Sequence, residues 1–99
     1  HTQLTSYNLK QISSLSTSYA IRFYELLIQF KKTGNRWIAL DLLKERLELD
    51  KKYDRFFNLK VRVIQPSIDE INEKTDLSVS WDVVKKGRII VGLKFNITE

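Results

Sequence analysis

The sequence predicts an α+β domain in which several helices are followed by a C-terminal β-hairpin. Apolar residues recur at three- and four-residue spacing over residues 18–32 and 59–74, which indicates two amphipathic helices. Residues 77–84 and 89–97 instead alternate with a period of two, which indicates two strands. The segment Lys85-Lys86-Gly87-Arg88 separates these strands and predicts the turn of the hairpin.

Two helices are expected in the first third of the chain. The first, Tyr7 to Ser13, is short, and a polar turn over residues 14–18 follows it and ends by capping the next helix. The second runs from Ser18 to Lys32. Its apolar face consists of Ala20, Phe23, Tyr24, Leu27, Ile28 and Phe30. Gly34 suits a left-handed position just after this helix.

A short strand at Arg36-Trp37-Ile38 and a helix from Leu40 to Leu47 are expected next. The helix carries leucines at positions 40, 43 and 47 on one face. Ala39 stands where Ser or Asp would normally cap it, so we expect its start to lack a side-chain cap.

The helix over residues 59–74 is expected to begin after Asn58, a favourable N-cap residue. Its core-facing residues are Val61, Ile64, Ile68 and Ile71. Its opposite face carries Arg62, Gln65, Asp69 and Glu73. Pro66 lacks an amide donor, and its ring clashes with the carbonyl of Arg62 in a regular helix. We therefore expect a kink, a loosened turn or a restarted helix between Arg62 and Pro66.

The order helix, helix, short strand, helix, helix, strand, strand is that of a winged helix.

The chain has 99 residues, of which 42% are hydrophobic, which is enough for one domain with a modest core. No apolar run approaches the roughly 20 residues of a membrane span. Cysteine is absent, which excludes disulfides and thiolate metal sites and fits a reducing cytoplasm.

Few residues are available for catalysis, so we expect neither an enzyme nor a bound cofactor. The only histidine is His1, where the remnant of a tag is a simpler explanation than a ligand. The acidic residues between positions 69 and 76 have no histidine or cysteine beside them to complete a metal site, and we expect a solvated helix face. The three glycines are widely separated and form no phosphate-binding loop.

Six aromatic residues occupy amphipathic positions, and core packing explains them better than a platform for stacking bases. They are Phe23, Tyr24, Phe30, Trp37, Trp81 and Phe95. Tyr19 lies outside this pattern, at the start of a helix, and is expected to be exposed.

The distribution of basic residues points to DNA. The net charge is +5, and from Lys51 onward ten Lys and Arg residues outnumber seven Asp and Glu residues. Lys60 and Arg62 lie in the first turns of the helix before the hairpin, and the N-terminal residues of such a helix meet base edges in the major groove. The basic turn would contact phosphate or the minor groove, and the hydroxyls and amides of residues 16–18 would contact phosphate. The candidate DNA-binding residues are Lys60, Arg62, Asn58, Arg55, Gln65, Lys85, Lys86, Arg88, Ser16, Ser18 and Tyr19.

Several ordered blocks of the sequence resemble the iteron-binding replication initiator (Rep) proteins of plasmids. Residues 18–27, SYAIRFYELL, resemble a signature of that family. Further matching blocks are Tyr53, Leu59-Lys60-Val61-Arg62-Val63, Pro66, Glu70-Ile71-Asn72, Thr75-Asp76, Lys85-Lys86-Gly87-Arg88 and Phe95. The blocks span nearly the whole chain at matching spacing, which makes the resemblance specific.

The resemblance implies that residues 1–99 are the second, C-terminal winged-helix domain of a longer initiator. In such initiators this domain docks its recognition helix in the major groove of a directly repeated origin sequence, and replication of the plasmid begins there. The implied partners are double-stranded origin DNA, host replication proteins and, for the full-length protein, a second copy of itself. The resulting dimer would repress its own gene. The implied location is the bacterial cytoplasm, with no membrane partner.

Three positions depart from the family's pattern. Val61 stands where the family often has a basic residue, so one contact is absent or the sequence preference differs. Leu59 replaces an aromatic residue, and Ala39 replaces a Ser-type cap. Arg22 and Glu25, prominent in the signature, are expected to be structural, because they can pair with each other or position a neighbouring turn.

Two other functions fit the same fold. A winged helix can serve as a protein-interaction or dimerisation module, with DNA contacted mainly by another domain of the protein. It can also belong to a cellular transcription regulator. Failure of the isolated chain to bind repeated origin DNA at low salt would favour the first alternative. Origin repeats next to the gene would exclude the second.

Overall fold

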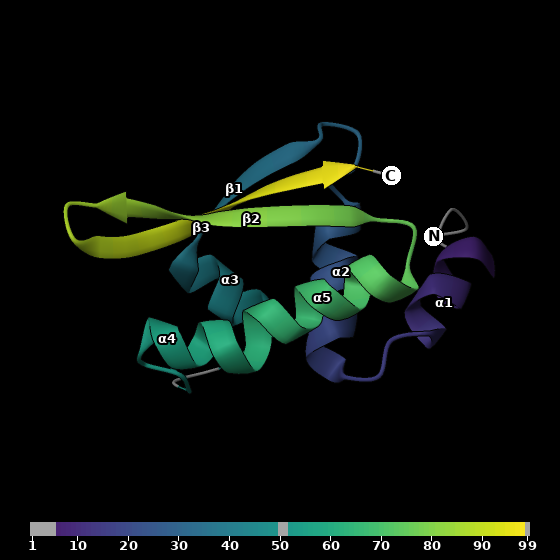
Figure 1. Cartoon of the computed structure of the whole chain (residues 1–99), viewed down its shortest axis with the longest axis horizontal. Coiled ribbons are helices and arrows are strands. Elements are labelled where there is room, and N and C mark those ends of the chain that lie inside the picture. Colours follow the sequence, from purple (N-terminus) through teal and green to yellow (C-terminus); the bar gives the residue numbers. More distant parts are fainter. Residues whose placement is uncertain (1–5, 50–51, 99) are drawn as a thin grey trace.

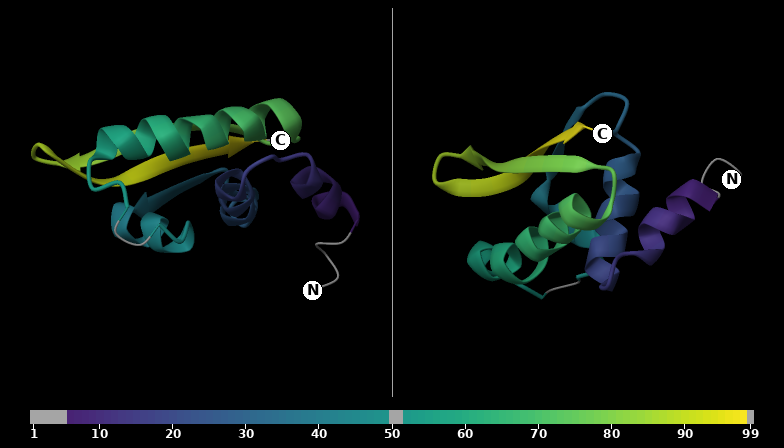
Figure 2. Two further views of the ribbon diagram at one scale, coloured as in Figure 1. Left: turned by 90° about the horizontal axis from the view of Figure 1, so that it is seen from below. Right: turned by 45° about the vertical axis from the view of Figure 1, so that its right-hand side comes forward.

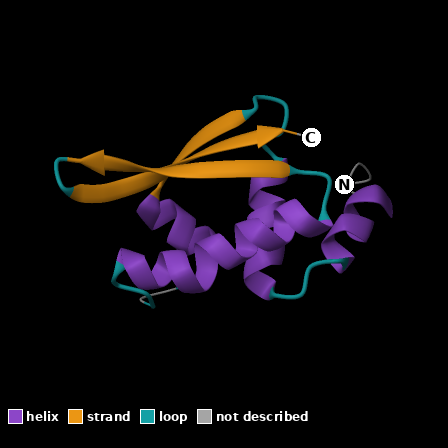
Figure 3. Ribbon diagram, in the orientation of Figure 1, coloured by secondary structure: helices purple, strands orange, loops and turns teal. Residues whose placement is uncertain are grey.

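The computed structural model describes residues 6–49 and 52–98, and its architecture is the α+β winged helix that the sequence predicts. The elements in chain order are α1 (Ser6–Ser13), α2 (Ser18–Ile28), β1 (Asn35–Ala39), α3 (Leu40–Arg46), α4 (Phe56–Leu59), the π-helical turn η2 (Lys60–Ile64), α5 (Gln65–Lys74), β2 (Ser78–Lys86) and β3 (Ile89–Thr98). The sheet lies on one side of the domain and the helices lie on the other (Figures 1 and 3). Within the described residues, no helix has the length and apolar character needed to cross a membrane.

The three strands form an antiparallel sheet in the order β1-β3-β2. β2 and β3 form the predicted hairpin, with Val79 opposite Ile97 near its base. Gly87 and Arg88 form the two-residue turn, and Gly87 has a φ of +65°, a value that glycine adopts without steric cost. The free end of the hairpin projects beyond the helices as a wing (Figure 1).

A β-bulge between Val84 and Lys85 shifts the register of the wing. On β3, buried and exposed side chains alternate from Leu93 to the end of the strand. Ile89 lies beyond the bulge, at the wing tip, and is 69% exposed. The predicted alternation is therefore confirmed where the strand faces the helices and is wrong near the tip, because a bulge re-aims the side chains that follow it.

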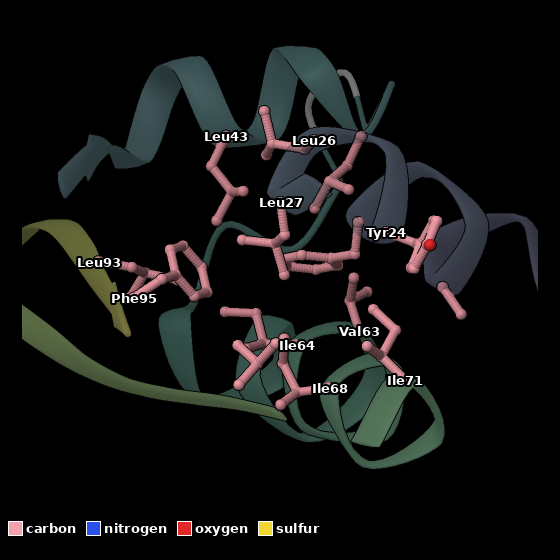
Figure 4. Close-up of a cluster of buried hydrophobic side chains, with 14 of the residues drawn as sticks. Tyr24, Leu26, Leu27, Leu43, Val63, Ile64, Ile68, Ile71, Leu93 and Phe95 are labelled. Carbon is pink, nitrogen blue, oxygen red and sulfur yellow. The ribbon is translucent and has the colours of Figure 1, made fainter. Parts of the chain in front are cut away.

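The core fills the space between the helices and the sheet (Figure 4). α2 packs against α5, α5 against β2, and α3 against β1 and β3. Phe23 of α2 and Phe95 of β3 meet edge to face, with their ring centroids 6.1 Å apart. The residues labelled in Figure 4 are Tyr24, Leu26, Leu27, Leu43, Val63, Ile64, Ile68, Ile71, Leu93 and Phe95.

The prediction that the aromatic residues pack in the core is confirmed for most of them. Phe23, Tyr24 and Phe95 are buried, and Phe30 and Trp81 are partly buried against the core. Trp37 is 49% exposed, so the prediction is wrong for this residue. Its ring instead lies beside Gly92 of β3, where an added Cβ would stand 3.1 Å from two ring atoms. Tyr19, expected to be exposed, is partly buried against the core.

α4, η2 and α5 form one continuous rod over residues 56–74 (Figure 2). The rod begins at Phe56 instead of Leu59, and Arg55 takes the N-cap position without a side-chain hydrogen bond. The prediction that Asn58 caps the helix is therefore wrong, since Asn58 lies inside α4. Phe56 explains the earlier start, because it is partly buried against the core and its ring lies 6.5 Å from that of Trp81. Apolar packing thus sets this helix start in place of a cap.

The irregular turn predicted near Pro66 is present as η2. The amide of Gln65 donates to the carbonyl of Lys60, five residues earlier, which is the hydrogen bond of a π-helix. Pro66 follows in the first turn of α5. Because this turn is wider than an α-helical one, the rod continues past Pro66 although Pro66 has no amide donor and carries a bulky ring. The prediction of a loosened turn between Arg62 and Pro66 is confirmed.

The core stripe of the rod keeps three of the four predicted residues, loses Val61 and gains Leu59 and Val63. Leu59, Val63, Ile64, Ile68 and Ile71 are buried. Val61, predicted to face the core, is 48% exposed. Val61 is two residues from both Leu59 and Val63, which is about 200° around a helix, so it faces away when they face inward.

α2 ends at Ile28 instead of Lys32, and hydrogen-bonded turns continue to Gly34. Gly34 has a φ of +81°, as the sequence predicts. α2 starts at Ser18 and its N-cap is Thr17, whose side-chain oxygen accepts from the amide of Ala20, so the prediction that the polar turn over residues 14–18 caps this helix is confirmed. α3 begins after Ala39 without a side-chain cap, as expected.

Candidate nucleic-acid interface

The start of the long rod and the tip of the wing lie at the same end of the domain in all three views of Figures 1 and 2. The contact between Phe56 of α4 and Trp81 of β2 joins the two elements. A second connection lies further along, where the side chain of Asn72 on α5 bonds to the backbone of β2. The rod and the wing are therefore held as one rigid unit, which a surface that grips a duplex requires.

The predicted basic residues of this unit are exposed. Arg55, Asn58, Lys60 and Arg62 are exposed along the first turns of the rod, and Lys85, Lys86 and Arg88 are exposed at the wing tip. Gln65 is partly buried, and its amide nitrogen donates to the carboxylate of Asp69 at 2.9 Å. The structure therefore brings together seven of the predicted residues and gives Gln65 a partner within the chain. That these side chains contact DNA stays a prediction.

Sequence reasoning missed Phe57, which is 70% exposed on the first turn of the rod. It lies four residues before Val61, so the two exposed apolar side chains share one face of the helix. The doublet Phe56-Phe57 carried a signal, because adjacent residues lie about 100° apart around a helix and the two rings therefore point in different directions.

Ser16, one of the residues predicted to contact phosphate before α2, is already hydrogen-bonded within the protein. The amide and the hydroxyl of Ser16 both donate to one carboxylate oxygen of Glu70, at 3.0 and 2.6 Å. A carboxylate of the protein thus already lies where an anion would approach this turn. The roles predicted for Ser16 and Ser18 stay predictions, and at Ser16 phosphate would have to displace Glu70.

A hollow of about 320 Å³ lies between the start of α2 and the rod. Arg62 and Tyr19 both line it, so the structure places the predicted residue Tyr19 close to Arg62. Asp69, Glu70 and Glu73 line the same hollow. The acidic residues lie about two to three turns beyond Arg62 on the same rod and make that part of the hollow unfavourable for an anion.

Glu70 is not part of a solvated face, which corrects the interpretation of the acidic residues. Its side chain is 13% exposed and also pairs with Lys74 at 3.2 Å. The hydrogen bonds from Ser16 hold the pKa of this carboxyl below its usual value, and the ion pair with Lys74 lowers it further, against the opposing effect of burial. This carboxylate connects α5 to the start of α2, so its role is structural.

Arg22 has the structural role that was expected, with a different partner. Its guanidinium pairs with the carboxylate of Glu48 at 3.3 Å. Glu48 follows α3 and has a φ of +58°, a left-handed conformation that is uncommon outside glycine. The ion pair therefore fixes α2 to a tight turn, which confirms that Arg22 positions a neighbouring turn.

Within residues 6–49 and 52–98, no group of three or more His, Cys, Asp and Glu side chains could hold a metal ion. His1 lies outside the described residues.

A family model and a solved structure both point to initiator proteins. Residues 39–97 match the family model described as "Initiator Rep protein, WH2". An uncharacterised 27.6 kDa protein of Escherichia coli is 31% identical over 93 residues, which cover 92% of this chain and 38% of that protein. The solved structure of the Pi initiator protein in complex with iteron DNA has a TM-score of 0.71 and 31% identity, over 84% of this chain and 39% of that one. The chain thus spans under two fifths of the length of both relatives.

Proposed function

Because this chain belongs to the initiator Rep protein family, we propose that it binds double-stranded DNA sequence-specifically at the repeats of a plasmid origin. Binding there would place the initiator where replication of the plasmid starts. The observation that carries the proposal is the exposure of Arg55, Lys60 and Arg62 at the start of the rod, which lies at the same end of the domain as the wing tip. The likeness to an initiator solved on iteron DNA supports it.

The geometry supports a division of labour between the two elements. The rod enters the major groove with its N-terminal turns, where Arg62 can pair with guanine and Asn58 with adenine. The wing lies along the backbone, where Lys85, Lys86 and Arg88 neutralise phosphate. The wing thus contributes affinity that is independent of sequence, and the rod selects the site.

The longer protein would carry the remaining functions. We propose that this chain is its second, C-terminal winged-helix domain, since both relatives extend well beyond the matched region. The full protein would recruit host replication proteins in the bacterial cytoplasm. As a homodimer, it would repress its own gene. The domain itself would need neither a cofactor nor a catalytic site.

Binding of the purified chain to two duplexes tests the proposal. One duplex carries the direct repeats of the parent replicon's origin, and the other carries the same bases in scrambled order. We expect tighter binding to the repeats, at a fixed salt concentration, by fluorescence anisotropy. Arg62→Ala should reduce this preference, whereas Lys94→Ala, which removes an exposed charge from the middle of β3, should leave it unchanged.

Failure to bind either duplex at low salt would overturn the proposal. The chain would then be a protein-interaction or dimerisation module, and DNA would be contacted by the rest of the initiator. Equal binding to both duplexes would leave a non-specific DNA-binding domain and would also contradict the proposal.

A further inference from the structure

We infer that Phe57 and Val61 recognise thymine through its 5-methyl group in the major groove. The inference rests on the proposed function and deepens it, because it names a base that the rod selects and the side chains that select it.

The starting observation is an apolar strip on an otherwise polar surface. Phe57 is 70% exposed and Val61 is 48% exposed, although Leu59 and Val63 between and beside them are completely buried. Residues four apart on a helix lie one above the other, so the two side chains form one continuous strip. Single exposed apolar residues are common, but two on one helical face beside a candidate binding surface require a reason.

The surroundings of the strip favour DNA over an apolar protein partner. Arg55, Lys60 and Arg62 are exposed on the same turns of the rod. Between Asp54 and Asp69 the chain has no acidic residue, so the charged side chains of the first turns of the rod are all positive. A basic surface attracts the phosphate backbone at long range and orients the strip toward the groove.

The chemistry of the two side chains then limits what they can recognise. Neither carries a hydrogen-bond donor or acceptor on its side chain, so neither can pair with the polar edge of any base. The thymine methyl group is the apolar group that base pairs present in the major groove. Both residues lie in the N-terminal turns of the rod, the part that reaches base edges in this mode of docking.

The test uses the purified 99-residue chain and synthetic DNA. A random duplex library is first selected for binding, and the enriched sequence is then synthesised with deoxyuridine replacing one thymine at a time. Deoxyuridine lacks the methyl group and keeps the hydrogen bonds of thymine. We expect roughly fourfold weaker binding at one or two positions, as the loss of one buried methyl group predicts.

Variants assign the effect to the strip. In Val61→Ala or Phe57→Ala, the ratio of affinities for thymine and deoxyuridine DNA should fall to about one at the affected position. Val61→Ala should still fold, because Val61 is exposed and alanine has the higher helix propensity. Lys60→Ala is the matched control. It should weaken binding to both DNAs by the same factor and leave the ratio unchanged.

The possible outcomes distinguish a failure of this inference from a failure of the proposed function. An enriched sequence that tolerates deoxyuridine at every position, or that contains no thymine, would overturn the inference and leave the proposed function standing. A deoxyuridine effect that persists in both variants would also overturn it. If the selection enriches no sequence, the proposed function fails and the inference fails with it.

Discussion

The side-chain amide of Asn72 and the backbone of Val79 form a two-point clamp between the rod and the wing. The amide nitrogen of Asn72 donates to the carbonyl of Val79 at 2.9 Å, and its oxygen accepts from the amide of Val79 at 2.7 Å. Asn72 therefore takes the place of a neighbouring strand at this point of β2. The clamp fixes where the wing starts relative to the rod.

Replacing Asn72 should loosen the wing. We expect Asn72→Ala to lower the free energy of unfolding by about 1–3 kcal/mol, because it leaves two partly buried backbone groups of Val79 without partners. Urea denaturation measures this loss. Asn96→Ala, on an exposed position of β3, is the control and should change stability little. If the free energy of unfolding falls no further than in the control, water must replace the two hydrogen bonds of Asn72 without loss of stability.

The tie between Glu70 and Ser16 should make stability depend on pH. The pKa of Glu70 is lower in the folded protein than its ordinary value of 4.5, chiefly through the hydrogen bonds from Ser16. The ionised carboxylate therefore stabilises the fold above that value, and the contribution is lost as pH falls through the folded pKa. We expect Glu70→Gln to lower the urea midpoint at neutral pH and the gap from wild type to narrow in acid.

Glu73→Gln is the matched control for Glu70, since Glu73 lies almost one turn further along the same rod and is exposed. It should change neither the midpoint at neutral pH nor its slope in acid. A constant gap between Glu70→Gln and wild type from neutral to acid pH would contradict the assignment, because the loss would then be independent of ionisation.

Periodicity predicted the fold because burial dominates the choice of elements. The strands, α3, the long rod and the wing all follow from apolar spacing, and Pro66 by itself predicts the irregular turn η2. The blocks shared with initiator proteins narrowed the function further, and the family match over residues 39–97 agrees with them.

The wrong predictions concern details that depend on contacts distant in sequence. Asn58 is a good cap by local preference, but the contact between Phe56 and Trp81 starts the helix earlier. Val61 fits a three-residue spacing with Ile64, yet the stripe is set by Leu59, which is buried. Glu70 resembles a solvated acid until α2 is folded against α5.

Arg62 should determine sequence preference more than overall affinity. Bidentate pairing of Arg with guanine is worth roughly 1–3 kcal/mol of discrimination. We therefore expect Arg62→Ala to lose about that much binding free energy on the cognate repeat and less on random duplex DNA. Titrations of both duplexes at one salt concentration measure the two losses. Equal losses would mean that Arg62 contacts phosphate only.

Lys86 should contribute to affinity without contributing to selection. It is the last residue of β2, is exposed, and lies beside the two-residue turn of the wing, where we propose that it contacts phosphate. Each phosphate contact releases about one counterion, so Lys86→Ala should weaken binding to cognate and random DNA by a similar factor. It should also lower the slope of log affinity against log salt by about one unit.

The measurement is a salt titration of both duplexes, with Lys94→Ala as the control. An unchanged slope in Lys86→Ala would mean that the wing tip lies outside the interface, and the rod would then have to bind the duplex without the wing.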